Sequence, residues 1–150
     1  MKISFETPDQ PEVISLIADL DTYQLTLYPP ESVYALDMAS LKQPNVLFAV
    51  ARSPQGAAVG CGAIVVTPEF GEVKRMFVSP AARGQGVARC LLGALETVAQ
   101  ERGVSRFMLE TGPYQPEALA LYERLGYARR GPYADYPDDP LSVFMEKRLA

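Results

Sequence analysis

The sequence contains no histidine. A Ser-His-Asp triad, a Cys-His pair and a histidine-ligated zinc site are therefore excluded. Any acid or base in this protein must be Glu, Asp, Tyr, Lys, Cys or a water molecule. Cysteine is also scarce, and Cys61 and Cys90 form neither a disulfide framework nor a metal-ligand pattern. We therefore expect no bound metal and a reducing, cytoplasmic environment.

Long apolar runs are absent as well. No stretch is long enough to cross a bilayer, and the N-terminal segment MKISFETPDQ lacks the apolar core of a signal peptide. The formal net charge is -4, which argues against general nucleic-acid binding. We expect neither a membrane nor a nucleic acid as a partner.

The sequence does have enough apolar residues for one globular domain. Its 150 residues are 48% hydrophobic and 21% charged, with no internal repeat. A chain of this length can bury a real core but leaves little room for a second one. We expect a single domain over 1–150.

Hydrophobic periodicity predicts both strands and helices along the chain. Alternating or short apolar runs predict strands at 2–6, 45–52, 57–67, 72–79, 106–112 and 142–150. Helical spacing follows Pro11, with Asp9 as the expected N-cap, and a shorter helix ends at Leu41. Two further helices are predicted at 84–102 and 115–127. The fold class is therefore α/β (α+β), a mostly antiparallel mixed sheet flanked by helices.

A glycine-containing loop lies between the strand at 72–79 and the longest amphipathic pattern. Gly84 and Gly86 allow a ligand to approach the backbone closely because no β-carbon intrudes. The N–H groups and the dipole at the start of the following helix favour an anion. Between residues 73 and 95 every charged side chain is basic, namely Lys74, Arg75, Arg83 and Arg89. The stretch predicts a seat for a phosphate or pyrophosphate, and the alternative is a tight strand-to-helix turn.

Two common phosphate-binding motifs do not fit this loop. The P-loop string G-x-x-x-x-G-K-[ST] is absent from the sequence. The dinucleotide fingerprint G-x-G-x-x-G would need a third glycine where Arg89 stands, and it would need a parallel βαβ setting. The loop therefore matches neither of these two motifs.

The loop and its surroundings resemble the GNAT superfamily of N-acetyltransferases. The string RGQGVA (Arg83–Ala88) fits the pattern Arg/Gln-x-x-Gly-x-Gly/Ala, and ALALYERLGY (Ala118–Tyr127) follows downstream in the expected order. The strings PPESVYAL, LETG and PYADYPDDPLSVFMEKRL look like those of a bacterial subgroup related to YsnE. The resemblance implies the GNAT fold over nearly the whole chain.

The resemblance also implies where acetyl-CoA binds as cosubstrate. In this family the pyrophosphate lies on backbone N–H groups of the loop, which here comprises Arg83, Gly84, Gln85, Gly86, Val87 and Ala88, with Arg89 close by. The pantetheine arm lies between two strands that splay apart, here 72–79 and 106–111. It would pair with edge groups of Met76, Phe77 and Val78, and one N–H would polarise the thioester carbonyl.

An acid and a base are needed because an ammonium must lose a proton and a thiolate must leave. Tyr122 matches the family tyrosine that protonates the thiolate, although it could be a packing residue. Glu72 is the first choice for the base, with a solvated turn carboxylate as the alternative. Glu110, in a strand expected to be buried, is the second choice, and a cross-sheet ion pair would explain it equally well. We expect Cys90 to be a small packing residue and not an acyl carrier.

The acceptor pocket in this family is framed by the early helices and a late loop. Tyr28, Glu31, Glu110 and Tyr133 are our candidates, and their aromatic rings and carboxylates suit a cationic or aromatic amine. Exposed polar loops without a substrate role are the alternative. Many relatives form dimers, so a homodimer is among the expected assemblies.

The expected activity is acetyl-CoA-dependent N-acetyltransfer by direct attack, to the amine of a small molecule or a protein. Two other hypotheses remain open from the residues alone. One is a non-catalytic acyl-CoA-binding module, and the other is an interaction domain without a cofactor.

Overall fold

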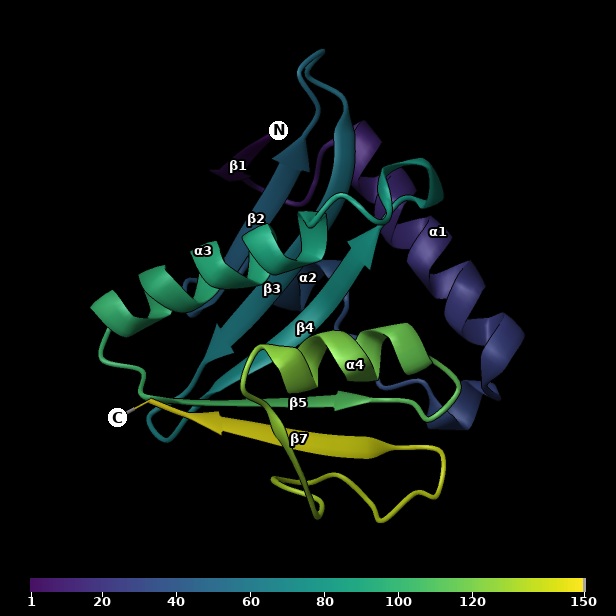
Figure 1. The fold of residues 1–150 in the computed structure, drawn as a ribbon, viewed down its shortest axis with the longest axis vertical. Coiled ribbons are helices and arrows are strands. Elements are labelled where there is room, and N and C mark those ends of the chain that lie inside the picture. The colour runs from purple at the N-terminus through teal and green to yellow at the C-terminus, as the bar shows by residue number, and fades with distance from the viewer. Residues whose placement is uncertain (150) are drawn as a thin grey trace.

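The computed structural model describes residues 1–149, which form one seven-stranded sheet in the order β1-β2-β3-β4-β5-β7-β6 (Figure 1). All neighbouring strands are antiparallel except β4 and β5, which are parallel. The strand bounds are β1 Lys2–Phe5, β2 Val46–Arg52, β3 Ala58–Val66, β4 Gly71–Val78, β5 Arg106–Thr111, β6 Ala128–Arg130 and β7 Val143–Arg148.

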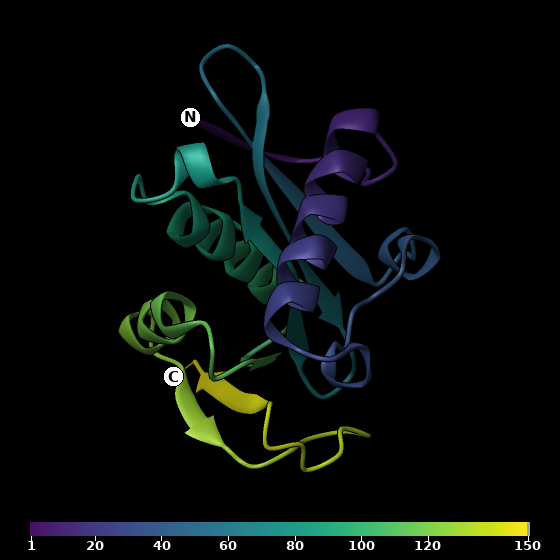
Figure 2. The ribbon, with the colours of Figure 1, turned by 90° about the vertical axis from the view of Figure 1, so that its right-hand side faces the viewer.

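Helices cover both faces of this sheet. Figure 2 shows α1 on one side and α3 with α4 on the other. The helix bounds are α1 Pro11–Leu27, α2 Met38–Leu41, α3 Val87–Glu101 and α4 Pro116–Arg124, with single 3-10 turns η1 Pro30–Ser32 and η2 Pro80–Ala82. The predicted mixed, mostly antiparallel sheet flanked by helices is confirmed. No helix within residues 1–149 combines the length and apolarity that a membrane crossing needs.

The alternation of side chains along β2 shows how the sheet builds two cores. Leu47, Ala49 and Ala51 face the cluster beneath α3 and α4. Phe48 and Val50, between them in sequence, face the cluster beneath α1. Successive side chains of a strand point to opposite faces, so an apolar run with no polar positions is what a doubly covered strand requires.

Most predicted helices and strands begin and end close to the observed bounds, and three differences stand out. The helix predicted at 84–102 begins at Val87 because Gly84 and Gly86 have φ of 79° and 77°, outside the helical region. The N-cap of α1 is Gln10, so the prediction of Asp9 was wrong. The short strand β6 was not predicted, since three residues are too few to show a period.

The sheet opens between β4 and β5. Their parallel ladder has three residue pairs, and the last joins Val73 to Leu109. Beyond it β4 has a bulge, where Arg75 takes a left-handed conformation with φ of 59°. The two strands diverge from this point (Figure 1). The divergence exposes an unpaired edge of β4 in the middle of the protein.

Candidate active site

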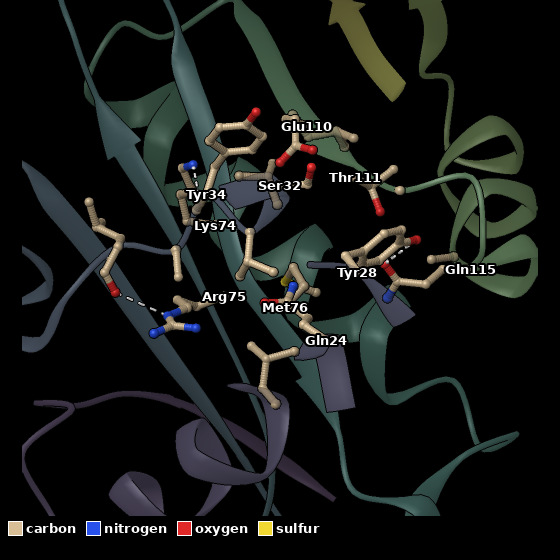
Figure 3. Close-up of a pocket in the computed structure, with 18 of the residues that line it drawn as sticks. Gln24, Tyr28, Ser32, Tyr34, Lys74, Arg75, Met76, Glu110, Thr111 and Gln115 are labelled. Atoms are coloured by element: carbon tan, nitrogen blue, oxygen red, sulfur yellow. Dashed lines mark hydrogen bonds between the residues drawn. The ribbon is translucent and has the colours of Figure 1, made fainter. Parts of the chain in front are cut away.

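A cavity lies at this opening between β4 and β5. Its walls come from α1, the loop after η1, β4, β5, α4 and, through Leu141, the loop before β7. Figure 3 shows Glu110, Tyr34 and Lys74 at one part of the cavity and Tyr28 with Gln115 at another. Parts of the chain that lie far apart in sequence therefore meet at one site.

The loop before α3 presents free backbone donors. The first backbone bond of the helix runs from the N–H of Cys90 to the carbonyl of Gly86. The N–H groups from Gly84 to Arg89 have no backbone acceptor among residues 1–149, and Gly84, Gln85 and Gly86 are exposed. Such donors at a helix N-terminus fit a phosphate or pyrophosphate.

The side chain of Arg83 stabilises this loop. Its Nε donates to the carbonyl oxygen of Val78 at 3.1 Å. Its guanidinium lies over the rings of Tyr23, at 5.6 Å, and Phe77, at 5.7 Å. The side chain therefore ties the loop to α1 and β4. Its backbone remains in the predicted phosphate seat.

The edge of β4 is oriented by its pairing with β3. Ser79 donates its N–H to the carbonyl of Val59 at 2.9 Å. Peptide groups alternate in direction along an antiparallel ladder, so those of Phe77 also face β3 and those of Val78 face the opening. Met76 lines the cavity. Of the three predicted pantetheine contacts, Met76 and Val78 therefore face the site, whereas Phe77 pairs away from it.

Tyr122, on α4, lines the cavity. Its side chain is buried at 8% relative exposure, and burial raises the pKa of its phenol to about 12. No side-chain hydrogen bond to this phenol is found within residues 1–149. Its neighbour Tyr127 packs edge-to-face at 5.8 Å and donates its hydroxyl hydrogen to Glu96 at 2.6 Å, which is a packing role. Tyr122 is therefore a protonated donor without a partner, facing the cavity.

Glu110, on β5, also lines the cavity. Burial raises the pKa of its carboxyl group to about 7, although the nearby hydroxyl of Ser142 and the positive charge of Lys74 partly offset this. The cross-sheet ion pair that would explain Glu110 structurally is not formed. Lys74 pairs with Glu72 at 3.4 Å, and Arg75 pairs with Asp21 at 2.5 Å. Glu110 is left as a carboxyl group that exchanges its proton near neutral pH.

Glu72 is neither a solvated turn carboxylate nor part of the cavity lining. It accepts hydrogen bonds from the hydroxyls of Tyr133 at 2.7 Å and Tyr136 at 2.5 Å. With the ion pair to Lys74, its Oε2 atom has three partners. The prediction that it acts as a base gains no support from this geometry.

The candidate acceptor residues are distributed unevenly. Tyr28 is buried and lines the cavity, with its hydroxyl accepting from the N–H of Tyr114 at 3.0 Å. Glu31 is exposed on η1, outside the cavity lining. Tyr133 packs against Phe70 and Phe144 in an aromatic cluster behind β5. Of the candidates, Tyr28 and Glu110 reach the cavity.

Other residues at the cavity were missed or misjudged from the sequence. Gln24 was not considered, and Lys74 and Arg75 were considered only as part of a basic stretch or as ion-pair partners. The sequence did contain a signal for Lys74 and Arg75, since two consecutive cations interrupt a mostly apolar strand. Cys90 was expected to be a small packing residue but is exposed, whereas Cys61 is buried.

Comparisons with known proteins agree with this geometry. The profile of the Acetyltransferase (GNAT) family matches residues 13–127. An IAA acetyltransferase of Azospirillum brasilense is 50% identical over 149 residues, covering 98% of this chain and 97% of the relative. The uncharacterized N-acetyltransferase YsnE of Bacillus subtilis (strain 168) is 37% identical over 142 residues, 92% of this chain and 93% of YsnE.

A solved structure supports the same conclusion. A crystal structure assigned to an acyl-CoA N-acyltransferase from Klebsiella pneumoniae has a TM-score of 0.84 at 45% identity, covering 99% of this chain and 97% of that one. The enzyme class predicted from the loop and from α4 is thereby confirmed. The chain belongs to the GNAT family of N-acetyltransferases, with YsnE among its relatives.

Proposed function

We propose that this protein transfers the acetyl group of acetyl-CoA to an amine by direct attack, with Glu110 as the base and Tyr122 as the acid. One observation carries the proposal: a carboxyl group with a pKa near neutrality and a protonated phenol line the same cavity, at the opening beside β4. An acid and a base of this kind are what aminolysis of a thioester requires.

The residues before α3 fit the diphosphate of acetyl-CoA. Gly84 and Gly86 hold left-handed conformations and lack side chains, so the backbone N–H groups are accessible. Val78 would offer its N–H to the pantetheine amides. Bound acetyl-CoA supplies an activated acyl carbonyl, and the chain's own contribution is to orient it and to move two protons.

Each proton transfer is assigned to a named atom. The carboxylate of Glu110 takes a proton from the acceptor's ammonium group, which frees the nitrogen lone pair. The nitrogen then forms a bond to the acetyl carbon as the carbon–sulfur bond breaks. The hydroxyl of Tyr122 gives its proton to the departing thiolate, and the second proton that the new amide nitrogen must lose returns to this phenolate. A phenol whose pKa is raised by burial stays protonated until that thiolate develops.

Glu110 is a better candidate for the base than Glu72. The Glu72 carboxylate is occupied by two tyrosine hydroxyls and by Lys74, and it lies outside the cavity lining. A base held in that way would have to break several hydrogen bonds before it could accept a proton. The raised pKa of Glu110 also matches the operating pH of a general base.

The charges at the cavity favour an acceptor that arrives as a cation. Lys74 and Arg75 are each paired with a carboxylate, at Glu72 and Asp21. Glu110 has no cation within salt-bridge distance in the part of the chain that the structure describes. The acceptor is therefore an amine of a small molecule or of a protein side chain. The name of the Azospirillum relative adds IAA to the compounds to be tested.

Two measurements test the proposal. Calorimetric titration with CoA should give a defined binding heat, and its absence would contradict the seat at α3. Release of the CoA thiol should then be followed with acetyl-CoA and tyramine, spermidine, a lysine peptide or IAA. Binding without turnover on any of these acceptors would favour the non-catalytic acyl-CoA-binding module.

A further inference from the structure

Two consecutive cations, Lys74 and Arg75, lie at the point where β4 leaves β5. The ladder between the strands ends at Val73, and Arg75 occupies the strained bulge with φ of 59°. Their side chains are largely buried, at 13% and 7% relative exposure. Buried cations are retained only with partners, so the identity of these partners is informative.

Both cations hold the backbone of one loop. Lys74 Nζ donates to the carbonyl of Tyr34 at 3.1 Å, and Arg75 Nε donates to the carbonyl of Leu36 at 3.1 Å. The loop at 33–37 has no helix or strand of its own, yet it forms part of the cavity wall. Two of its carbonyl groups are therefore held by side chains of β4.

Lys74 also reaches the late loop between β6 and β7. Its Nζ contacts the hydroxyl of Tyr136 and lies 5.0 Å from the centroid of that ring. The two loops are joined directly as well, since the hydroxyl of Tyr34 donates to Asp139 at 2.8 Å. The ion pair with Glu72 completes the surroundings of Lys74.

We propose that Lys74 is a positioning residue that assembles the acceptor side of the cavity from two loops, 33–37 and 131–142. Arg75 fixes the first of these loops from the adjacent bulge. This inference rests on the proposed function, but it assigns Lys74 no contact with the reacting atoms. The acetyl-CoA seat before α3 has no hydrogen bond to Lys74. Loss of Lys74 should therefore weaken binding of the acceptor and leave binding of acetyl-CoA unchanged.

The test compares Lys74→Met with Lys42→Met, which removes an exposed lysine whose ion partner is Asp9. For the amine of the screen with the highest kcat/KM, Lys74→Met should raise the acceptor KM at least about tenfold. The Kd for acetyl-CoA by calorimetry should stay within about twofold of the wild-type value. Lys74→Arg should recover most of the loss, because a guanidinium can also donate to both loops.

A second measurement does not depend on any acceptor. Hydrogen–deuterium exchange of Lys74→Met should become faster in peptides covering 33–37 and 131–142, and should stay unchanged at the start of α3. If Lys74→Met fails to fold, Tyr136→Phe removes one contact of the same lysine and should show a smaller effect in the same segments.

The outcomes separate the two proposals. Unchanged acceptor KM and unchanged exchange in a folded Lys74→Met protein would overturn the positioning role. An equal loss of acetyl-CoA affinity would overturn it too, since it would indicate general damage. A wild-type protein that releases no thiol with any amine contradicts the proposed function, and the exchange measurement still decides the role of Lys74.

Discussion

The phenol ring of Tyr28 lies where a β-carbon on Gly112 would have to be. Tyr28 follows α1 and Gly112 follows β5, so this contact joins the two sides of the opening in the sheet. The hydroxyl of Tyr28 also accepts a hydrogen bond from the backbone N–H of Tyr114 at 3.0 Å, which further fixes the position of the ring. Glycine is needed at this position for space.

Gly112→Ala should therefore destabilise the protein. The added methyl group forces Tyr28 to move, which should lower the free energy of unfolding by about 2 kcal/mol in urea denaturation. Gly93→Ala is the matched control, because Gly93 is exposed within α3 with open space around its β-carbon position. That variant should be more stable by up to about 1 kcal/mol. Equal stability of the two variants would contradict the close contact.

Gly86→Glu should abolish binding of acetyl-CoA. The residue has φ of 77° and stands at the N-cap of α3, so the variant adds both backbone strain and a negative charge to the proposed phosphate seat. Gly103→Glu is the control, since Gly103 has φ of 90° at the opposite end of α3. Each variant should lose about 1–2 kcal/mol of stability from strain. Calorimetry should show that Gly103→Glu retains its affinity for acetyl-CoA and that Gly86→Glu loses it. Retained affinity in both variants would disprove the proposed phosphate seat before α3.

Tyr122→Phe should reduce turnover more than affinity. Without the hydroxyl the departing thiolate must leave unprotonated, so kcat should fall by about 100-fold while the Kd for acetyl-CoA changes little. Tyr127→Phe is the comparison, because it removes a hydroxyl bonded to Glu96 away from the cavity. We expect a stability loss of about 1 kcal/mol there, with near-normal kcat. A fully active Tyr122→Phe protein would remove the phenol from the mechanism.

Glu110→Gln should be less active than the wild type. The wild-type rate should rise with pH through about 7, as the carboxyl group loses its proton. Glu110→Gln should lower kcat by about 100-fold or more at any pH. A rate that is independent of pH between 5 and 8 would contradict the assignment of the base.

The effect of Glu110 on stability has the opposite sign. Its pKa is raised from 4.5 to about 7 in the folded protein, so the native state binds more protons than the unfolded state in that interval. Its contribution is therefore most favourable at low pH and is lost as pH rises through about 7, by up to about 3 kcal/mol. Glu110→Gln should gain stability over wild type at pH 8 and not at pH 4. Glu69→Gln, on the exposed turn between β3 and β4, should show no such difference.

Local sequence patterns determined much of this protein. The amphipathic stretch from Val87 was enough to predict α3, which the structure confirms. Gly84, Gly86 and the absence of acidic residues around them predict a phosphate seat, which stays a prediction. Such features depend on neighbours within about four residues, where backbone preferences and side-chain periodicity act. Tyr122 followed from the same kind of pattern through its resemblance to the family motif.

The tertiary structure alone decided which carboxylate lies in the cavity and what holds its walls. Glu72 and Glu110 cannot be told apart from the sequence, since both are glutamates on predicted strands. In the structure, Glu72 accepts hydrogen bonds from the hydroxyls of Tyr133 and Tyr136. Glu110 has no such tyrosine partners among the described residues, and burial raises its pKa. Lys74 reaches loop residues 40 and 62 positions away. Desolvation and long-range pairing depend on which segments the fold brings together, and no local period of the sequence encodes that arrangement.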